Sequence, residues 1–161
     1  LMQNYYICEY VPAEFTARDM IGAFAAGQAC FAGVPENEAY RQLAAYLLRM
    51  HGGGILFRDL SGGNILIHPG AAGELDFSLI DTGRIRVLQR PLPLGARFAD
   101  LVRICNKMDS AGRAKFLRIY LGALKKELRW WQQWRFVAYD LKVAAKRRIG
   151  RKAWKRLFRW Q

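Results

Sequence analysis

The spacing of apolar residues along the chain predicts a mostly helical domain that is interrupted by one short β-hairpin. The clearest helical pattern begins at Pro35-Glu36-Asn37-Glu38, after which apolar residues recur every three or four positions until Gly52-Gly53-Gly54. Two apolar segments, residues 64–67 and 76–80, are predicted to pair as strands across a Pro-Gly turn. From about residue 96 to the end the pattern is helical, with one apolar stripe through Leu117, Tyr120, Leu121, Leu124 and Leu128.

The N-terminal part of the chain predicts a strand followed by a helix. Residues 5–11 are aromatic and β-branched, and Pro12 ends this segment. Thr16-Ala17-Arg18-Asp19 resembles a capping box, so we expect a helix over residues 19–31. The fold class that follows from these patterns is α+β and mostly helical.

The size and composition of the chain limit its class. A chain of 161 residues fits one domain with a real core. It contains no apolar run of about 18 residues, so we expect no transmembrane helix. We also expect no signal peptide, because the N-terminus lacks a basic region followed by an apolar segment and a cleavage site. Three widely spaced cysteines suit a reducing cytosol.

The charge is very unevenly distributed along the chain. Residues 1–112 hold 10 basic and 11 acidic side chains, whereas residues 113–161 hold 16 basic and 2 acidic ones. A segment this basic predicts an anionic partner, which could be a phospholipid surface, a phosphorylated glycolipid or a nucleic acid.

The candidate chemistry lies in two segments, Phe57-Arg58-Asp59-Leu60-Ser61-Gly62-Gly63-Asn64 and Leu79-Ile80-Asp81-Thr82-Gly83. Phosphoryl transfer from a magnesium nucleotide needs one group that orients the attacking hydroxyl and two oxygen ligands that hold the metal. Asp59 is the candidate catalytic base, and Asn64 and Asp81 are the candidate metal ligands. The kinase signature H-R-D-L-x-x-x-N followed by D-F-G is matched except at two positions, where Phe57 replaces the His and Thr82 replaces the Phe.

These segments resemble the lipopolysaccharide core kinases of Gram-negative bacteria, the Kdo and heptose kinases, over roughly residues 1–110. In that family a helix ending in Leu-x-x-x-His leads through a Gly-Ile segment to the catalytic loop, and a Leu-Ile-Asp-x-x-Arg segment follows. Here these parts are residues 47–51, 54–55, 59–64 and 79–84. The resemblance implies a protein-kinase-like C-terminal lobe, with a short β-hairpin carrying the catalytic loop, that uses ATP and Mg²⁺.

The same resemblance divides the chain into three parts. Residues 1–12 would be the last strand of the N-terminal lobe and the hinge, with the Glu9 carbonyl and the Val11 N–H facing the adenine. Residues 13–112 would form the core of the C-terminal lobe, and residues 113–161 its basic, Trp-rich final helices. The phosphate-covering loop and the lysine of the N-terminal lobe cannot be placed in this sequence. We therefore expect a C-lobe portion that is inactive alone, or a truncated relative.

Several further residues have two interpretations. His51 looks catalytic in isolation, but at a helix end it is expected to be structural. Asp100 matches the helix Asp that braces the catalytic loop in this fold and is expected to be structural support. Arg58 matches the Arg that pairs with a phosphorylated activation loop in many protein kinases, but a local salt bridge is its expected role. Arg84 and Arg86 either meet anionic substrate groups or form a solvated face.

The C-terminal segment mixes tryptophan with basic residues. Such a mixture is typical of a membrane interface, and the basic residues add attraction to anionic lipid. The alternative is that the tryptophans pack the last helices while the charges are only solvated. The residues concerned are Trp130, Trp131, Trp134, Lys146, Arg147 and Arg148.

The leading functional hypothesis is an ATP-dependent phosphotransferase acting on a sugar hydroxyl of the lipopolysaccharide inner core. Its acceptor would be the core oligosaccharide or a lipid-A-linked precursor. The enzyme would be cytoplasmic and peripheral on the anionic inner face of the inner membrane. An antibiotic or small-alcohol phosphotransferase of related fold fits the same catalytic residues.

Two other hypotheses remain. The Phe57 and Thr82 departures favour a catalytically incomplete pseudokinase that binds anionic membranes, although the intact Asp59, Asn64 and Asp81 oppose it. A nucleic-acid-binding protein is indicated by charge alone. We expect no specific nucleic acid partner, because no recognition motif is present.

Overall fold

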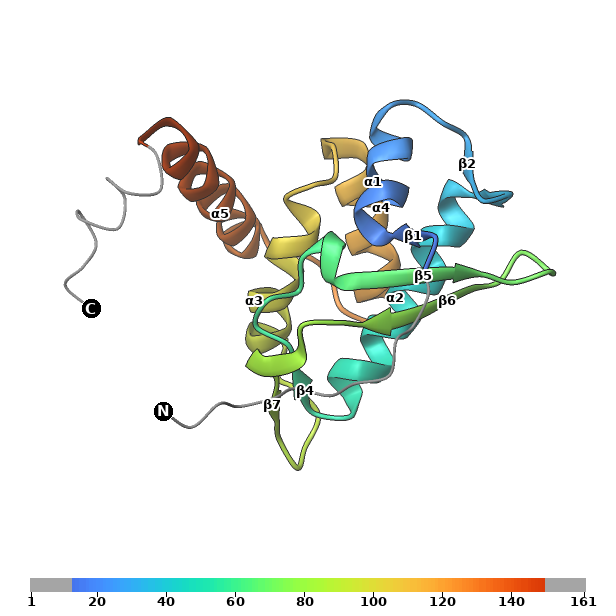
Figure 1. The fold of residues 1–161 in the computed structure, drawn as a ribbon. Helices are drawn as coiled ribbons and strands as arrows, with labels where there is room; N and C mark the ends of the chain where they lie inside the picture. The colour runs from blue at the N-terminus through green and yellow to red at the C-terminus, as the bar shows by residue number, and fades with distance from the viewer. Residues whose placement is uncertain (1–12, 150–161) are drawn as a thin grey trace, which may run out of the picture.

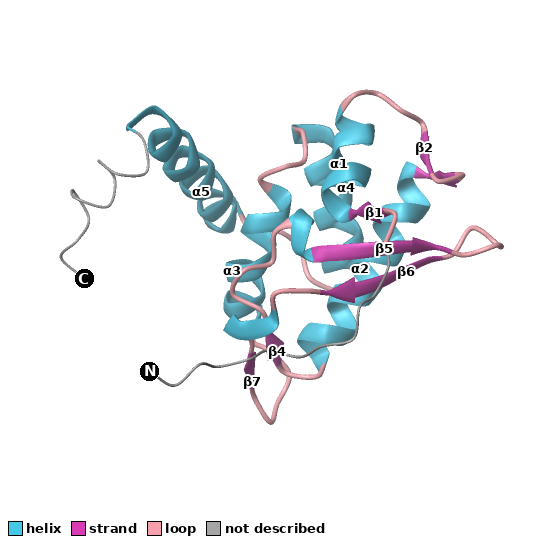
Figure 2. Ribbon diagram, viewed as in Figure 1, coloured by secondary structure: helices cyan, strands magenta, loops and turns pink. Residues whose placement is uncertain are grey.

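The structure, a computed structural model that describes residues 13–149, is a mixed α+β fold in which helices predominate (Figure 2). The helices of this part are α1 (Ala17–Ala25), α2 (Glu36–Gly52), α3 (Leu94–Cys105), α4 (Ser110–Gly122) and α5 (Trp130–Ile149). Its strands are β1 (Phe15–Thr16), β2 (Cys30–Phe31), β3 (Val34–Pro35), β4 (Ile55–Leu56), β5 (Ile65–Pro69), β6 (Leu75–Leu79) and β7 (Arg86–Val87). The predicted strand at residues 5–11, with Glu9 and Val11, lies outside the described residues. The predicted division of the chain at residues 12 and 112 stays a prediction.

Helix α1 begins at the predicted cap and ends earlier than predicted. The Thr16 backbone N and Oγ1 donate to Asp19 Oδ2 at 2.8 and 2.7 Å, which confirms the capping box. The helix stops at Ala25, not at residue 31, because Gly27 adopts a φ of 86°. The residues beyond it form the antiparallel pair β2–β3, so the C-terminal end of the predicted helix is wrong.

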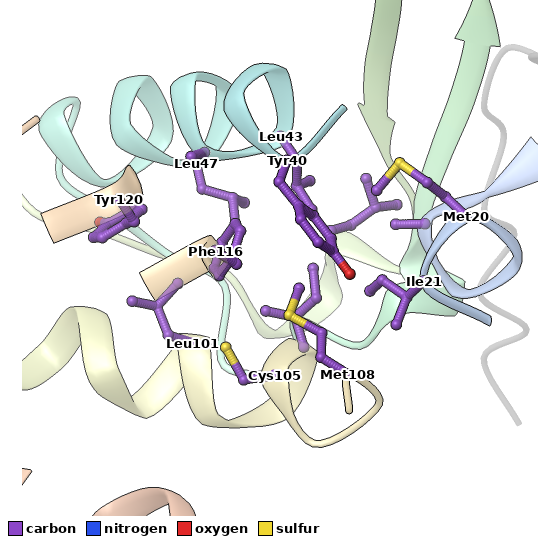
Figure 3. Close-up of a cluster of buried hydrophobic side chains, with 14 of the residues drawn as sticks. Met20, Ile21, Tyr40, Leu43, Leu47, Leu101, Cys105, Met108, Phe116 and Tyr120 are labelled. Atoms are coloured by element: carbon purple, nitrogen blue, oxygen red, sulfur yellow. The ribbon is translucent and has the colours of Figure 1, made fainter. Parts of the chain in front are cut away.

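The core lies between α2 and its neighbours (Figure 3). Tyr40, Leu43 and Leu47 project from the buried face of α2 and are at most 1 % exposed. The ring of Tyr40 lies 6.1 Å from that of Phe116 on α4, in an edge-to-face arrangement. The predicted α2, which begins after Pro35 and ends at the glycine run, is therefore confirmed.

The predicted hairpin is also confirmed, with slightly different bounds. Strands β5 and β6 pair antiparallel, with Ile65 opposite Leu79, and β1 adds to the outer edge of β5. A second, short antiparallel pair, β4–β7, joins the segment before residue 57 to the segment after Asp81. These two pairings place both ends of the candidate catalytic segments close to each other.

The C-terminal helical region is broken twice, which the sequence pattern did not predict. Helix α4 ends at Gly122, so Leu124 and Leu128 lie in the connection to α5 and not on a continuous stripe. Lys125 in this connection has a φ of 52°, which interrupts the helix. Figure 1 shows α5 beside α3 and projecting from the body of the molecule. No helix between residues 13 and 149 is long and apolar enough to cross a membrane.

Candidate active site

The buried carboxylate of Asp100 holds the candidate catalytic loop, residues 57–64, in place. Asp100 on α3 is fully buried and accepts two hydrogen bonds, from Phe57 N and Arg58 N, both at 2.8 Å. The side chains of Phe57 and Leu60 are buried in the core, at 1 % and 0 % exposure. Apolar anchors and a charge-assisted backbone clamp therefore fix the shape of the loop.

Two residues of the site adopt strained backbone conformations. Arg58 has a φ of 65°, and Asp81 has a φ of 56° with a ψ of 48°. Non-glycine residues in this left-handed region cost about 1–2 kcal/mol each, and such residues cluster at functional sites. Here Arg58 directly precedes the candidate base, and Asp81 is a candidate metal ligand. Both are positions where a functional constraint on the backbone is expected.

Asp59, the candidate base, presents a half-buried carboxylate to two arginines. Its side chain is 30 % exposed, and Arg84 Nη1 lies 3.3 Å from Oδ2. Arg103 Nη1, from α3, lies 3.7 Å from Oδ1. Arg84 was expected to meet substrate groups or solvent; in the structure it pairs with Asp59 while its side chain stays 72 % exposed, so both interpretations stay predictions. Arg103 was not anticipated, although its spacing of three residues after Asp100 places it on a neighbouring position of the same helix.

Asn64 and Asp81 lie at the same end of the β5–β6 hairpin. The Asn64 side-chain Nδ2 donates to the Asp59 carbonyl at 3.0 Å, which fixes the amide against the loop. The register of β5 and β6 continues into a hydrogen bond from Ile80 N to Asn64 O at 3.1 Å. Asp81 follows directly, exposed, at the start of the 3₁₀ turn Thr82–Arg84. The hairpin thus gathers all three candidate groups at one end.

Behind the loop is a buried polar network that sequence reasoning identified only in part. His51 at the end of α2 is fully buried, and its Nδ1 lies 2.6 Å from the Tyr120 hydroxyl. The other ring nitrogen lies 3.5 Å from Asp100 Oδ2. Arg97 donates to the same hydroxyl at 3.3 Å. His51 therefore faces the interior, where it stands behind Asp100.

The ionisation of Tyr120 reflects its place in this network. Burial raises the pKa of the Tyr120 phenol, and the adjacent Arg97 guanidinium opposes part of that rise. The hydroxyl thus stays protonated and can take part in hydrogen bonds to its neighbours. Tyr120 and Arg97 could not be found from local patterns, because Tyr120 reaches His51 from α4 and Arg97 reaches the Tyr120 hydroxyl from α3.

The remaining candidate residues lie away from this network. Arg86 is exposed on β7, opposite Leu56. The α5 candidates are all exposed, and they include Trp130, Trp131 and Trp134 at 74, 49 and 61 %. These three tryptophans do not pack the interior, so the packing interpretation fails for them. Lys146, Arg147 and Arg148 are exposed at the end of the same helix.

The donor set suits a magnesium nucleotide better than a metal held by protein alone. Among residues 13–149, no three His, Cys, Asp or Glu side chains gather as a metal site. The exposed Asp81 carboxylate and the Asn64 amide are hard oxygen donors at one end of a hairpin. Mg²⁺ commonly takes one or two such ligands and fills its octahedron with water and phosphate oxygens.

One comparison with known proteins gives a fold. The chain is similar to a solved structure described as WaaP in complex with acyl carrier protein, with a TM-score of 0.51 and 21 % sequence identity. The match covers 69 % of this chain and 48 % of that one, so this chain spans about half the length of the structure it matches. No protein-family model and no curated protein sequence matches it. The likeness is one of fold alone, and this mixed α+β chain is consistent with a kinase-like fold.

Proposed function

We propose that this chain carries the C-terminal lobe of an ATP-dependent kinase that phosphorylates a sugar hydroxyl of the lipopolysaccharide inner core, on Kdo or heptose. The observation that supports this most directly is the gathering of Asp59, Asn64 and Asp81 at one end of the β5–β6 hairpin. The likeness of fold to WaaP, a lipopolysaccharide core heptose kinase, supports the same class of reaction.

Each residue of the site has a role in this proposal. Asp59 accepts a hydrogen bond from the acceptor hydroxyl and aims it at the γ-phosphate. Asn64 and Asp81 would hold Mg²⁺, which would supply charge neutralisation of the nucleotide phosphates. Outside the described residues, the backbone of Glu9 and Val11 would meet the adenine.

The arginines around Asp59 fit this role. An acceptor hydroxyl that approaches Asp59 must share or displace Arg84, whose side chain is 72 % exposed. An ion pair this exposed contributes about 0–1 kcal/mol, so its displacement is inexpensive. Arg103 is less exposed and is held at 5.9 Å over the ring of Tyr139 on α5, so it would stay beside the base.

The acceptor and its location follow from the resemblance. The core oligosaccharide, free or linked to lipid A, is anionic and lies at the cytoplasmic face of the inner membrane during its synthesis. We propose that the protein acts there as a peripheral enzyme.

The test is phosphotransfer from labelled ATP to core oligosaccharide by the full-length gene product. Asp59→Asn keeps the shape of the side chain but removes the base, and we expect it to lower the rate by about 10²–10⁴-fold. Asp76→Asn is the matched control, because Asp76 is an exposed carboxylate on the same hairpin whose side chain, among residues 13–149, accepts a hydrogen bond only from the next backbone N–H. Normal transfer by Asp59→Asn would refute the proposal.

One observation favours a second candidate, a catalytically incomplete binding module for anionic membranes. The Asp59 carboxylate is engaged by both Arg84 and Arg103, which compete with an acceptor for its oxygens. A binding module of this kind would not bind magnesium nucleotide and would not transfer phosphate. Removal of the competing arginine in Arg84→Gln would leave both results unchanged. Nucleotide binding measured by calorimetry separates the two candidates.

A further inference from the structure

Helix α5 has one face that packs against the body of the protein. Gln132 and Phe136 are buried, and Tyr139 and Val143 are half-buried, at spacings of four, three and four residues. The Phe136 ring lies 5.8 Å from that of Phe98 on α3. This face accounts for the attachment of α5 to the rest of the fold.

The opposite face of α5 is apolar and exposed. Trp130, Trp134, Val137 and Leu141 repeat the spacing of the buried face but are shifted by two residues, which turns them to the other side of the helix. Their exposed fractions are 74, 61, 40 and 64 %. Of the eight large hydrophobic side chains exposed between residues 13 and 149, six lie on α5. We call Trp130, Trp134, Val137 and Leu141 the outer stripe.

The charges on α5 identify the kind of partner that suits the outer stripe. Arg135, Lys142 and Lys146 are exposed along one flank, between the buried face and the outer stripe. Asp140, the acidic residue of this helix, is turned toward the body, where it accepts hydrogen bonds from Asn106 and Arg113 at 2.6 and 2.7 Å. The accessible side of the helix is therefore apolar with a basic border.

We propose that the outer stripe of α5 docks the protein on an anionic phospholipid bilayer, with the helix lying in the plane of the interface. Tryptophan side chains favour the headgroup region, while valine and leucine reach the acyl boundary and lysine and arginine meet the lipid phosphates. Figure 1 shows α5 projecting at the edge of the molecule beside α3, so a flat surface can reach it. This surface gives the proposed kinase its membrane partner and in that respect rests on the proposed function.

Other occupants fit the outer stripe less well. A second copy of the chain would bring two basic helices together, and like charges repel. A nucleic acid would use the basic flank, but it offers no apolar phase for Val137 and Leu141. A bilayer that the helix crosses does not fit either, because α5 is not apolar enough to span one.

The test is flotation of the full-length gene product with vesicles of phosphatidylcholine containing 30 % phosphatidylglycerol, compared with vesicles of phosphatidylcholine alone. We expect binding to the anionic vesicles and a blue shift of tryptophan fluorescence. Trp134→Gln with Leu141→Gln should weaken this binding by at least about tenfold. Lys142→Gln and Lys146→Gln should each weaken it about fivefold, and added salt should reduce their effect.

Val87→Gln is the matched control for the outer stripe. Val87 is 72 % exposed on β7, so its replacement removes an exposed apolar side chain elsewhere on the surface. All these positions are exposed, and unchanged thermal unfolding will verify that the variants fold. The proposal is overturned if anionic vesicles are not bound, if Val87→Gln weakens binding as much as the stripe variants, or if only a DNA duplex is bound.

The vesicle assay is independent of the kinase proposal. A water-soluble core oligosaccharide without lipid A should be phosphorylated equally well by the wild type and by the outer-stripe variants. Loss of vesicle binding with retained transfer therefore supports the docking surface, whereas vesicle binding without transfer to either the free or the lipid-A-linked core leaves the docking surface intact and refutes the kinase.

Discussion

The clamp from Asp100 to the 57–64 loop gives a prediction whose size can be worked from the structure. Asp100 is fully buried, and each carboxylate oxygen accepts one backbone N–H at 2.8 Å, from Phe57 and from Arg58. Asp100→Asn keeps one acceptor but turns an amide NH₂ toward the other donor. A hydrogen bond to a charged group contributes about 1.5–3 kcal/mol, and an unsatisfied buried N–H adds a penalty. We therefore expect a loss of about 2–4 kcal/mol in the free energy of unfolding.

The assay for this prediction is urea unfolding followed by circular dichroism, with amide hydrogen exchange at residues 57 and 58 as the local readout. The matched control is Asp109→Asn. Asp109 Oδ1 accepts from Gly112 N at 3.0 Å at the start of α4, and Asn caps a helix as well as Asp does. The control should stay within about 0.5 kcal/mol of the wild type. Equal stability of the two variants, or unchanged exchange at residues 57 and 58, would show that Asp100 does not hold the loop.

Three further predictions test the core and the turns. A Cβ at Gly54 (φ 79°) would lie 2.0 Å from a backbone oxygen, so Gly54→Ala should lower the free energy of unfolding in urea by more than about 3 kcal/mol. A Cβ at Gly52 would have no atom of another described segment within 4 Å, so Gly52→Ala should leave that free energy nearly unchanged. Leu47→Ala removes a fully buried side chain of α2 and should lower the free energy of unfolding in urea by about 2–5 kcal/mol. Burial raises the pKa of the Cys105 thiol, so mass spectrometry after brief alkylation at pH 8 should find Cys30 labelled and Cys105 unlabelled until the protein unfolds. Rapid labelling of Cys105 in the folded protein would contradict its place in the core.

Parts of the fold that depend on local patterns could be predicted from the sequence. Helix α2 has a long apolar period between Pro35 and the glycine run, and the hairpin has two apolar segments around a turn. The predicted C-terminal end of α1 was wrong because β2 and β3 are only two residues long, which is too short to give a recognisable strand pattern in the sequence. The pair β4–β7 joins Leu56 to Arg86, a contact that no local pattern reveals.

The candidate site was predictable to a similar extent. Asp59, Asn64 and Asp81 could be selected from the spacing of the kinase signature. The register of the β5–β6 hairpin then places Asn64 and Asp81 at the same end of the hairpin. The pairing of Asp59 with Arg84 and Arg103 depends on how α3 and the 3₁₀ turn pack around the loop. The contact of His51 with Tyr120 joins residues 69 positions apart, so only the tertiary structure brings it into view.

The surroundings of Phe57 and Thr82 in the structure explain why the chain can depart from the kinase signature at these two positions. Phe57 stands where the signature has His, and its side chain is 1 % exposed, so the position serves as an apolar anchor. The backbone N–H groups of Phe57 and Arg58 bind Asp100, and these bonds do not depend on which side chain stands at position 57. Thr82 is exposed in the 3₁₀ turn that follows Asp81. The two departures therefore fall on an apolar anchor of the loop and on an exposed turn residue, while the oxygen groups that would meet a nucleotide and an acceptor are retained.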